Sequence, residues 1–263
     1  MDPNRRFSQT LESLASLKQE PAITGPVPAQ PEPAAPTLED VLSRIGSLPR
    51  EALFLGIASD GLPVLLNLHD PLPGPMLVIG EAGAGKTAFL KSIAHAVART
   101  HKESEVQYGV LTNNVQEWQE LENTSHRVGI FDVKHQSAQD FILSLASWAH
   151  ANRNPSQSIL ALVDDLESVA RLDVETLQNF RWLLLRGPAR RVWPIITLNA
   201  DRYGQVLAWI EIFRTRVFGR ITNRRAAEAL GGDKASAVDQ LGAKVQFTLR
   251  ENGDWLRFWL PSF

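Results

Sequence analysis

The residues with the clearest chemical meaning lie between Gly80 and Thr87 and read Gly-Glu-Ala-Gly-Ala-Gly-Lys-Thr. They fit the pattern G-x-x-x-x-G-K-[ST] in full. Glycines let the backbone wrap around phosphates, and the positive end of the following helix faces the same anion. Lys86 is expected to reach the β- and γ-phosphates of ATP, and Thr87 to ligate Mg²⁺. The predicted phosphate-binding residues are Gly80, Glu81, Ala82, Gly83, Ala84, Gly85, Lys86, Thr87 and Ala88.

A second group of candidate residues follows the apolar run 159–163. A continuous apolar run is typical of a parallel strand that is buried on both faces. Asp164 directly after it would lie at the carboxyl edge of the sheet, where open α/β sheets bind ligands. We expect Asp164 to hold Mg²⁺ and Asp165 to orient or deprotonate the attacking water. Asp165 and Glu167 could instead cap the next helix, and Glu167 could also be a further acid of the site.

The next apolar strand ends in Thr197-Leu198-Asn199. A polar side chain at this position could sense the γ-phosphate, and both Asn199 and Thr197 fit that role. Ordinary turn chemistry at the end of a strand would equally explain Asn199.

The arginines of the segment 186–191 are candidates for a role between subunits. In ring-shaped ATPases an arginine from one subunit completes the site of its neighbour and stabilises developing charge. Arg186 and Arg190 are the predicted catalytic arginines. The other interpretation is a solvated basic loop.

The candidate residues must be positioned by strands and helices, and the apolar runs of the sequence predict where these lie. Strands that alternate with helices favour a mainly parallel sheet with helices on both faces, an α/β fold. A hairpin of 53–57 and 63–68 precedes this core, and a capped helix 38–45 precedes the hairpin. The expected strands are 76–79, 106–111, 128–131, 159–163, 192–198, 217–221, 245–249 and 256–260, and the expected helices are 88–98, 137–151, 174–185 and 205–213.

The amino-terminal segment 1–36 has a different composition. Six prolines fall between positions 21 and 36, which indicates a semi-extended linker that cannot build a core. Residues 4–18 could form a short amphipathic helix that docks on a partner protein, or belong to a disordered tail. We therefore expect two parts, a tail of residues 1–36 and one ATPase domain of residues 37–263.

Composition narrows the class of protein further. The chain has 263 residues and no cysteine, so disulfides and thiolate metal sites are excluded. No apolar run is long enough for a membrane span, which together with the absence of cysteine favours the cytoplasm. The net charge is −2, but the window 181–225 holds ten arginines and two acids. This window carries +8, so the remainder carries −10, and a local basic surface could bind phosphate.

The order and spacing of these pieces resemble the FtsK/SpoIIIE–HerA group of P-loop motor ATPases over residues 50–263. The most telling likeness is the C-terminal run from Phe213-Arg214-Thr215-Arg216 through Ala229-Leu230-Gly231-Gly232 to Leu241-Gly242. Asp164-Asp165 takes the place of the family's Asp-Glu pair, and Asn199 stands where the family has a glutamine. The resemblance implies a RecA-like P-loop NTPase that forms a ring, usually of six subunits, and pumps double-stranded DNA with ATP.

Two functions stay open at this point. The first is an ATP-hydrolysing ring motor on DNA, which the order of the motifs and the basic window favour. The second is a nucleotide-gated switch or assembly module that binds ATP with little turnover. Asp165 favours the switch because it is one methylene shorter than the glutamate of the family.

Overall fold

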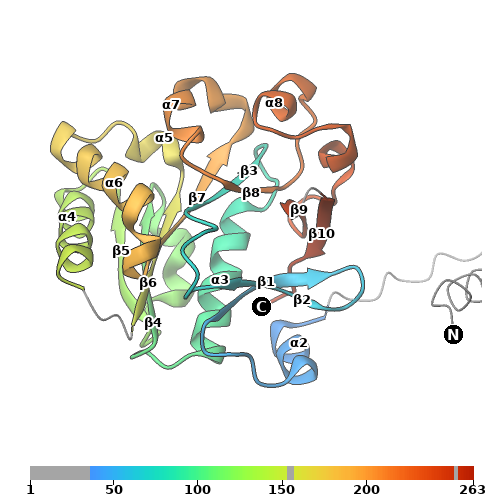
Figure 1. Ribbon diagram of the computed structural model, residues 1–263, viewed down its shortest axis with the longest axis horizontal. Helices are drawn as coiled ribbons and strands as arrows, with labels where there is room; N and C mark the ends of the chain where they lie inside the picture. Colours follow the sequence, from blue (N-terminus) through green and yellow to red (C-terminus); the bar gives the residue numbers. More distant parts are fainter. Residues whose placement is uncertain (1–35, 153–156, 252–253) are drawn as a thin grey trace, which may run out of the picture. The chain divides into compact units, whose positions relative to one another are not determined.

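A computed structural model describes residues 36–152, 157–251 and 254–263 (Figure 1). The predicted tail of residues 1–36, with its possible helix, lies outside the described residues except for Pro36. Within the described part of the chain, no helix is both long and apolar enough to cross a membrane.

The core of the fold is one ten-stranded sheet with the order β2-β1-β10-β9-β8-β3-β7-β6-β4-β5. The strands are β1 Ala52–Ala58, β2 Pro63–Asn67, β3 Met76–Gly80, β4 Val106–Thr112, β5 Arg127–Asp132, β6 Ser158–Asp164, β7 Val192–Asn199, β8 Thr215–Phe218, β9 Gln246–Glu251 and β10 Asp254–Trp259. The α-helices are α2 Leu38–Ile45, α3 Lys86–Thr100, α4 Gln136–Ala151, α5 Leu166–Val169, α6 Val174–Arg186, α7 Leu207–Ile210 and α8 Arg224–Ala229. Short 3-10 helices are η1 Val115–Leu121, η2 Pro188–Arg190, η3 Ala200–Gln205, η4 Lys234–Ser236 and η5 Val238–Gln240.

Six neighbouring strands, from β8 to β5 in the sheet order, run parallel. Their carboxyl ends therefore meet at one edge of the sheet, as the sequence predicts. The Gly80–Thr87 loop follows β3 at this edge, and Asp164 ends β6 there. Because β7 lies between β3 and β6, its last residues stand between the loop and Asp164.

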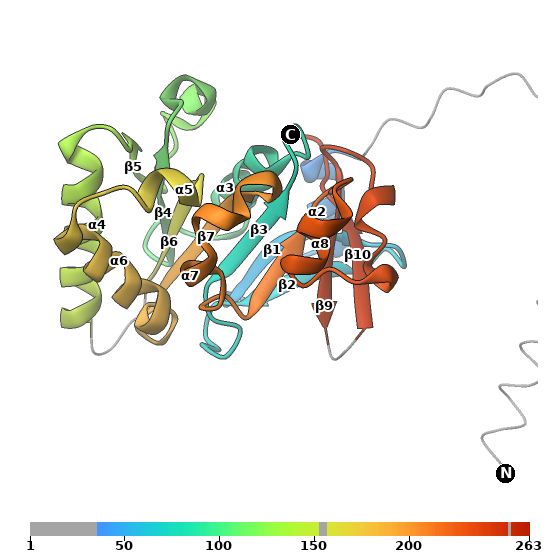
Figure 2. The ribbon, with the colours of Figure 1, turned by 90° about the horizontal axis from the view of Figure 1, so that it is seen from above.

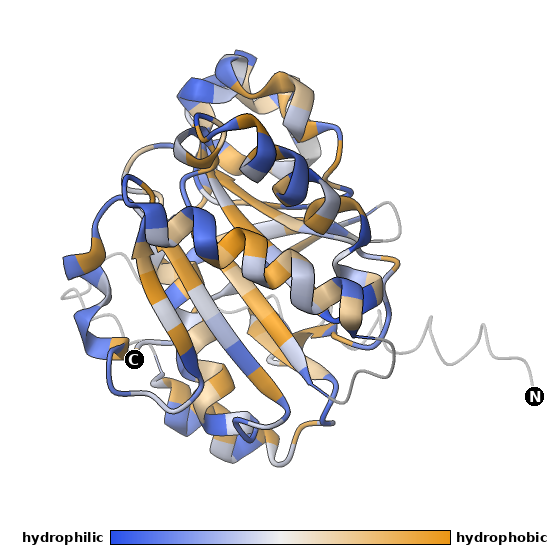
Figure 3. Ribbon diagram, turned by 90° about the vertical axis from the view of Figure 1, so that its left-hand side faces the viewer, coloured by the Kyte–Doolittle hydropathy of each residue, from blue (hydrophilic) through white to orange (hydrophobic). Residues whose placement is uncertain are grey.

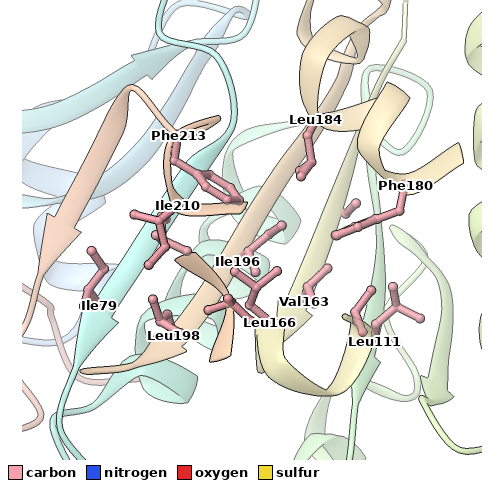
Figure 4. Close-up of a cluster of buried hydrophobic side chains, with 14 of the residues drawn as sticks. Ile79, Leu111, Val163, Leu166, Phe180, Leu184, Ile196, Leu198, Ile210 and Phe213 are labelled. Atoms are coloured by element: carbon pink, nitrogen blue, oxygen red, sulfur yellow. The ribbon is translucent and has the colours of Figure 1, made fainter. Parts of the chain in front are cut away.

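Helices cover both faces of the parallel strands, which explains why the central strands β3, β6 and β7 are buried along almost their whole length (Figures 2 and 3). Successive side chains of β3 alternate between two cores, as the pleat of a strand requires. Leu77 and Ile79 pack with the helices α4 to α8 (Figure 4). Met76 and Val78 pack on the other face with α3 and the buried Trp118 of η1.

The remaining four strands are antiparallel and extend the sheet beyond β8. The predicted hairpin forms β1 and β2, and the last two predicted strands form β9 and β10. The predicted helix 38–45 is confirmed as α2, with Thr37 as its cap: the Thr37 hydroxyl accepts a 3.1 Å hydrogen bond from the backbone N–H of Asp40. This helix packs on Phe54 of β1 and Ala96 of α3.

Two predicted elements differ from the structure. The predicted helix 205–213 is replaced by the end of η3 and the single turn α7, because Val206 between them, with φ −131° and ψ 23°, lies outside the helical region. The predicted strand 217–221 lies earlier in the chain, as β8 at Thr215–Phe218. Gly219 still donates to the carbonyl of Ile79 on β3, but the carbonyl of Arg220 accepts the N–H of Glu81, which lies in the phosphate loop beyond the sheet.

Candidate functional site

The glycine-rich loop between β3 and α3 has the backbone that its sequence demands. Gly83 and Gly85 have φ values of 77° and 94°, in the left-handed region that favours glycine. At Gly85 a side chain would also collide with Lys244, since an added Cβ would lie 2.5 Å from its Cα. The backbone N–H of Lys244 donates to the carbonyl of Ala84 at 3.1 Å. The conformation of the loop is therefore fixed by Lys244 as well as by its own glycines.

Lys86 points back into its own loop. Its Nζ donates to the carbonyl oxygens of Gly80 and Glu81 at 3.0 and 2.9 Å. Burial lowers the pKa of this ammonium, against the opposing attraction of Asp164, Asp165 and other nearby acids. A desolvated ammonium that is held only by two loop carbonyls, with carboxylates nearby, is suited to bind an oxyanion.

Two side chains, from the start of α3 and from β7, converge on Asp164 at the end of β6. The Thr87 hydroxyl donates to the two carboxylate oxygens at 3.0 and 3.2 Å, and Thr197 on β7 donates at 3.0 Å. Burial raises the pKa of Asp164, and the hydrogen bonds from Thr87 and Thr197 oppose that rise. The structure thus unites the two predicted metal ligands, Thr87 and Asp164, and adds a buried threonine that orients the carboxylate.

Asp165 and Glu167 follow Asp164 in very different settings. Asp165 has a φ of 106°, which is strained for a residue with a side chain. Its carboxylate accepts hydrogen bonds from Ser168 at 2.9 Å and from Asn113 at 3.4 Å. Glu167 is only 2% exposed, and neither of its oxygens has a hydrogen-bond partner among the described residues.

The burial of Glu167 bears on its role. A carboxylate that capped α5 would accept a backbone N–H, and Glu167 accepts none within the described part of the chain. The cap interpretation therefore has no support. A buried acid without a partner is costly, so such groups are common where a ligand, a water or a proton completes the site.

Asn199 ends β7 beside Gly80, its register partner on β3. Its side-chain oxygen accepts the backbone N–H of Asp201 at 3.2 Å and caps η3. Turn chemistry, one of the two interpretations of this residue, is therefore present. Of the two predicted sensors, Thr197 is the one that contacts Asp164.

Arg186 and Arg190 lie away from this cluster. Arg186 ends α6 and Arg190 ends η2, which leads into the start of β7, while the loop and Asp164 lie at strand carboxyl ends. The eight residues of β7 span about 25 Å, so both exposed arginines lie at the opposite edge of the sheet. They do not reach the phosphate loop of their own chain.

A clasp that the sequence does not reveal ties Glu81 to the segment after β8. The Glu81 carboxylate accepts from Arg220 Nε at 2.8 Å and from the N–H and hydroxyl of Thr222 at 3.0 and 2.7 Å. Burial raises the pKa of Glu81, but the hydrogen bonds from Thr222 and Arg220 outweigh it, so the pKa is lowered overall. These partners lie about 140 residues apart in sequence, so no local pattern could pair them.

The structure divides the basic window 181–225 into two groups. Four of its ten arginines have structural contacts: Arg191 bonds to Leu68, Arg216 to three backbone carbonyls, Arg220 to Glu81 and Arg224 to Glu228. The other six are exposed, at positions 181, 186, 190, 202, 214 and 225. The basic window is therefore not one continuous binding face.

The fold and the site together define a P-loop ATPase. Residues 74–208, just over half of the chain, match the NACHT domain family. The chain belongs to this family. The matched region begins before β3 and ends after β7, so it contains the phosphate loop, Asp164 and Thr197. No curated protein matches the chain in sequence.

Solved structures with the same fold include several ATPases. The cytoplasmic domain of the type VII secretion ATPase EccC from Thermomonospora curvata superposes with a TM-score of 0.67 at 15% identity, over 97% of this chain and 30% of that one. ATPases 2 and 3 of EssC from Geobacillus thermodenitrificans give 0.68 at 13% identity, over 90% and 48%. The pCW3 conjugation coupling protein TcpA, with ATPγS, gives 0.62 at 15% identity, over 87% and 70%.

These likenesses establish the RecA-like fold. The chain spans 30 to 48% of the length of the secretion ATPases. Their identities of 13 to 15% are too low to carry over a substrate or a partner.

Proposed function

We propose that the chain binds ATP with the Gly80–Ala88 loop and hydrolyses it at the edge formed by β3, β7 and β6. The observation that carries this proposal is the cluster in which Thr87 and Thr197 both donate to Asp164, beside the loop lysine. Backbone N–H groups of the loop bind the β-phosphate, and Lys86 exchanges its two carbonyl partners for phosphate oxygens. The cluster holds the γ-phosphate end of the nucleotide against Asp164.

The residues present fit a magnesium ion. Thr87 and Asp164 supply a hydroxyl and a carboxylate in contact, and Mg²⁺ is usually held by one or two carboxylates together with substrate phosphates. The raised pKa of Asp164 points the same way, since a cation would compensate its buried charge. When bound, the ion would neutralise charge that develops on the phosphates. Thr197 keeps the carboxylate of Asp164 turned toward Thr87.

Two acids are candidates to orient or deprotonate the attacking water. Asp165 is the first candidate, and its carboxylate is already held by Ser168 and Asn113. Glu167 is the second, and its buried carboxylate has no partner within the described residues. Replacing each acid separately by its amide distinguishes them. Turnover should fall by a factor of about 10²–10⁴ only in the variant that lacks the base, while ATP binding stays.

For the whole protein we propose an ATP-driven motor that acts on double-stranded DNA in the cytoplasm as a ring, most simply of six subunits. The position of Arg186 and Arg190 supports the ring. In a head-to-tail assembly, the edge that bears these arginines in one subunit would face the phosphate loop of the next. Each arginine could then stabilise the charge on the transferred phosphate in its neighbour's site.

The test is ATP turnover with and without linear double-stranded DNA, with Lys86→Ala as the blank. Stimulation of turnover several-fold by DNA is the expected result. Turnover well above the blank that DNA of any form leaves unchanged would count against a DNA motor. The same result would still support ATP hydrolysis by this chain.

A nucleotide-gated switch is the second candidate, and Asp165 is the observation that favours it. Its strained backbone and its hydrogen bonds to Ser168 and Asn113 hold the carboxylate in place without help from a nucleotide. If Asp165 is the only base, we expect slow hydrolysis, because its side chain is one methylene shorter than the glutamate of the similar motor ATPases. A switch predicts tight ATP binding with turnover equal to the Lys86→Ala blank, and vigorous turnover would exclude it.

A further inference from the structure

A lysine outside the glycine-rich motif lies against the phosphate loop. Lys244 belongs to the segment between η5 and β9, and its backbone N–H donates to the carbonyl of Ala84. Its backbone is so close to Gly85 that a Cβ added to that glycine would overlap it. Strand β9 lies beside β8 and is antiparallel to it, so β9 begins at the carboxyl edge, where the loop follows β3 (Figure 1). The fold thus brings Lys244 to the loop although the two lie far apart in sequence.

The backbone of Lys244 has a conformation that favours glycine. Its φ is 73°, in the left-handed region where a residue with a side chain is strained. Two hydrogen bonds close the turn around it: the Gly242 N–H donates to Gln246 Oε1 at 2.7 Å, and the Gln246 N–H donates to the Gly242 carbonyl at 3.0 Å. Strained residues persist where the surrounding structure fixes them, and they cluster at functional sites. A lysine where a glycine would fit better points to a role for its side chain.

The side chain of Lys244 is available for a ligand. It is exposed, and its ammonium forms no hydrogen bond or ion pair with any residue that the structure describes. Lys86, by contrast, is partly buried and bonds to two loop carbonyls. Lysine carries its charge on a flexible four-carbon stem, so the ammonium of Lys244 can extend past the backbone of Gly85 to an anion in the loop.

The charges around the loop favour a second cation. Four carboxylates attract the Lys86 ammonium: Asp164, Asp165, Asp201 and Glu81. Of these four, only Glu81 forms an ion pair with a residue that the structure describes, which is Arg220. The carboxylates thus outnumber the cations among them, and a triphosphate adds further negative charge. Because like charges repel at close range, a cation beside the loop would strengthen the binding of phosphates.

We propose that Lys244 is a second phosphate-binding lysine, which reaches over the loop from the β9 side and contacts the phosphate chain of the bound nucleotide. This inference rests on the proposed binding of ATP at the loop. Lys86 binds the phosphate chain from within the loop, and Lys244 binds it from outside. The turn fixes the Cα of Lys244 beside Gly85, so only the side chain has to become ordered when the phosphates bind.

Three substitutions separate the charge of Lys244 from its backbone. Lys244→Gln removes the charge and keeps most of the side chain, and Lys244→Arg keeps the charge. Lys244→Gly removes the side chain and relieves the strain, so its melting temperature should rise by about 2 °C. A loss of affinity in this variant cannot then come from a less stable fold. Lys102→Gln is the matched control, because Lys102 is an exposed lysine beyond the far end of α3.

Titration calorimetry in the presence of Mg²⁺ compares ATP with inorganic tripolyphosphate, which carries the phosphate chain without a nucleoside. We expect Lys244→Gln and Lys244→Gly to weaken both ligands by about tenfold, the loss of one charge-assisted contact. Lys244→Arg should bind both ligands almost as tightly as the unmodified chain, and Lys102→Gln should change neither affinity. The affinity for ATP should also fall less steeply with salt in Lys244→Gln than in the unmodified chain.

Four outcomes would overturn the inference in distinguishable ways. If Lys244→Gln binds both ligands as tightly as the unmodified chain, the side chain does not contact the phosphates, and the proposed ATP site stands without it. If only ATP is weakened, the lysine contacts the nucleoside instead. If only Lys244→Gly is weakened, binding depends on the turn and not on the charge. If the unmodified chain binds neither ligand, the proposed ATP site itself fails, and the proposed role of Lys244 fails with it.

Discussion

Lys86 contributes to two states of the phosphate loop. In the structure its ammonium is partly buried and bonds to the carbonyls of Gly80 and Glu81. The same group is the natural partner of phosphate oxygens, which are far stronger acceptors when charged. A side chain that bridges two loop carbonyls is not part of the packed core, so the fold does not depend on it.

The first prediction follows from this arrangement. Lys86→Ala should reduce ATP affinity by at least about a hundredfold, because a charge-assisted contact of a desolvated ammonium is lost. The melting temperature should change little. Titration with a fluorescent ATP analogue and thermal unfolding measure the two effects. Lys91→Ala, five residues later on α3, is the control and should bind ATP normally. Collapse of the fold in Lys86→Ala would contradict the prediction.

A second prediction concerns the buried charge of Asp164. Because burial raises its pKa, the ionised carboxylate lowers the stability of the nucleotide-free fold. Asp164→Asn keeps the shape and can still bond to Thr87 and Thr197. We expect it to raise the free energy of unfolding at pH 7 by about 1 kcal/mol, or about 2–4 °C in melting temperature. ATP hydrolysis should be lost in the same variant.

The pH dependence of this gain has a definite sign. A carboxyl with a raised pKa keeps its proton longer in the folded state, so the stability cost appears only as the pH rises through that pKa. The advantage of Asp164→Asn should therefore be absent in acid and complete at neutral pH. Unfolding curves of both proteins across this range provide the test. A constant difference at every pH would mean that charge burial is not the cause.

At the scale of elements, the clasp between the phosphate loop and the segment after β8 is the least expected feature. Glu81 receives three hydrogen bonds from Arg220 and Thr222, two of them from a single residue. The loop is thereby joined to the wall of the pocket that follows β8, which Thr222 lines. If the loop moves when it binds phosphate, the clasp would displace the residues after β8.

The third prediction tests the strength of this clasp. Glu81→Gln should lower the free energy of unfolding by about 1 kcal/mol at pH 7, since bonds to a charged acceptor weaken. The pKa of Glu81 is lowered in the fold, so its contribution is present above the pKa of the unfolded chain. It is lost as the pH falls through the lowered pKa of Glu81 in the fold. Thermal unfolding of the unmodified chain and of Glu81→Gln, at pH 7 and in acid, measures this loss.

The control for the clasp is Glu103→Gln, at an exposed position in the turn before β4. It should leave stability unchanged at either pH. Equal effects of the two substitutions would show that Glu81 contributes no more than a surface acid.

Several elements were predictable because their evidence is local. Apolar runs mark the parallel strands, and Thr37 with Asp40 marks the start of α2. The short elements α5, α8 and η1 have only four to seven residues, which are too few to show a comparable periodicity. The helix predicted at 205–213 fails for a similar reason: its apolar residues pack on the core from two separate turns.

At the scale of the whole molecule, the two edges of the sheet carry different chemistry. The carboxyl edge holds the phosphate loop and Asp164, and the opposite edge holds Arg186 and Arg190. One chain cannot bring these edges together, since the length of the strands separates them. If the arginines act in catalysis, they act on another subunit.

The fourth prediction tests this division between subunits by mixing. A chain with both Arg186→Ala and Arg190→Ala should lose most turnover, as Lys86→Ala does. Mixed together, the two inactive proteins should regain activity, because the lysine variant supplies arginines to intact loops of its neighbour. A removed arginine finger typically costs a factor of about 10³–10⁵. Turnover at several mixing ratios is the measurement.

Arg44→Ala, at an exposed position on α2, is the control for general loss of positive charge and should keep full turnover. If the double arginine variant hydrolyses ATP at the normal rate, the two arginines belong to a solvated loop. If it is inactive and mixing restores nothing, the arginines do not act between subunits.

The sequence by itself determined the phosphate loop, the acid after β6 and the order of alternating strands and helices. Each of these rests on residues that are neighbours along the chain, so composition and spacing carry the information. Only the tertiary structure decided that Thr197 orients Asp164, that Glu167 is buried without a partner among the described residues, and that Glu81 is clasped by Thr222. These contacts join segments far apart in sequence or depend on burial, and both arise only when the strands assemble side by side.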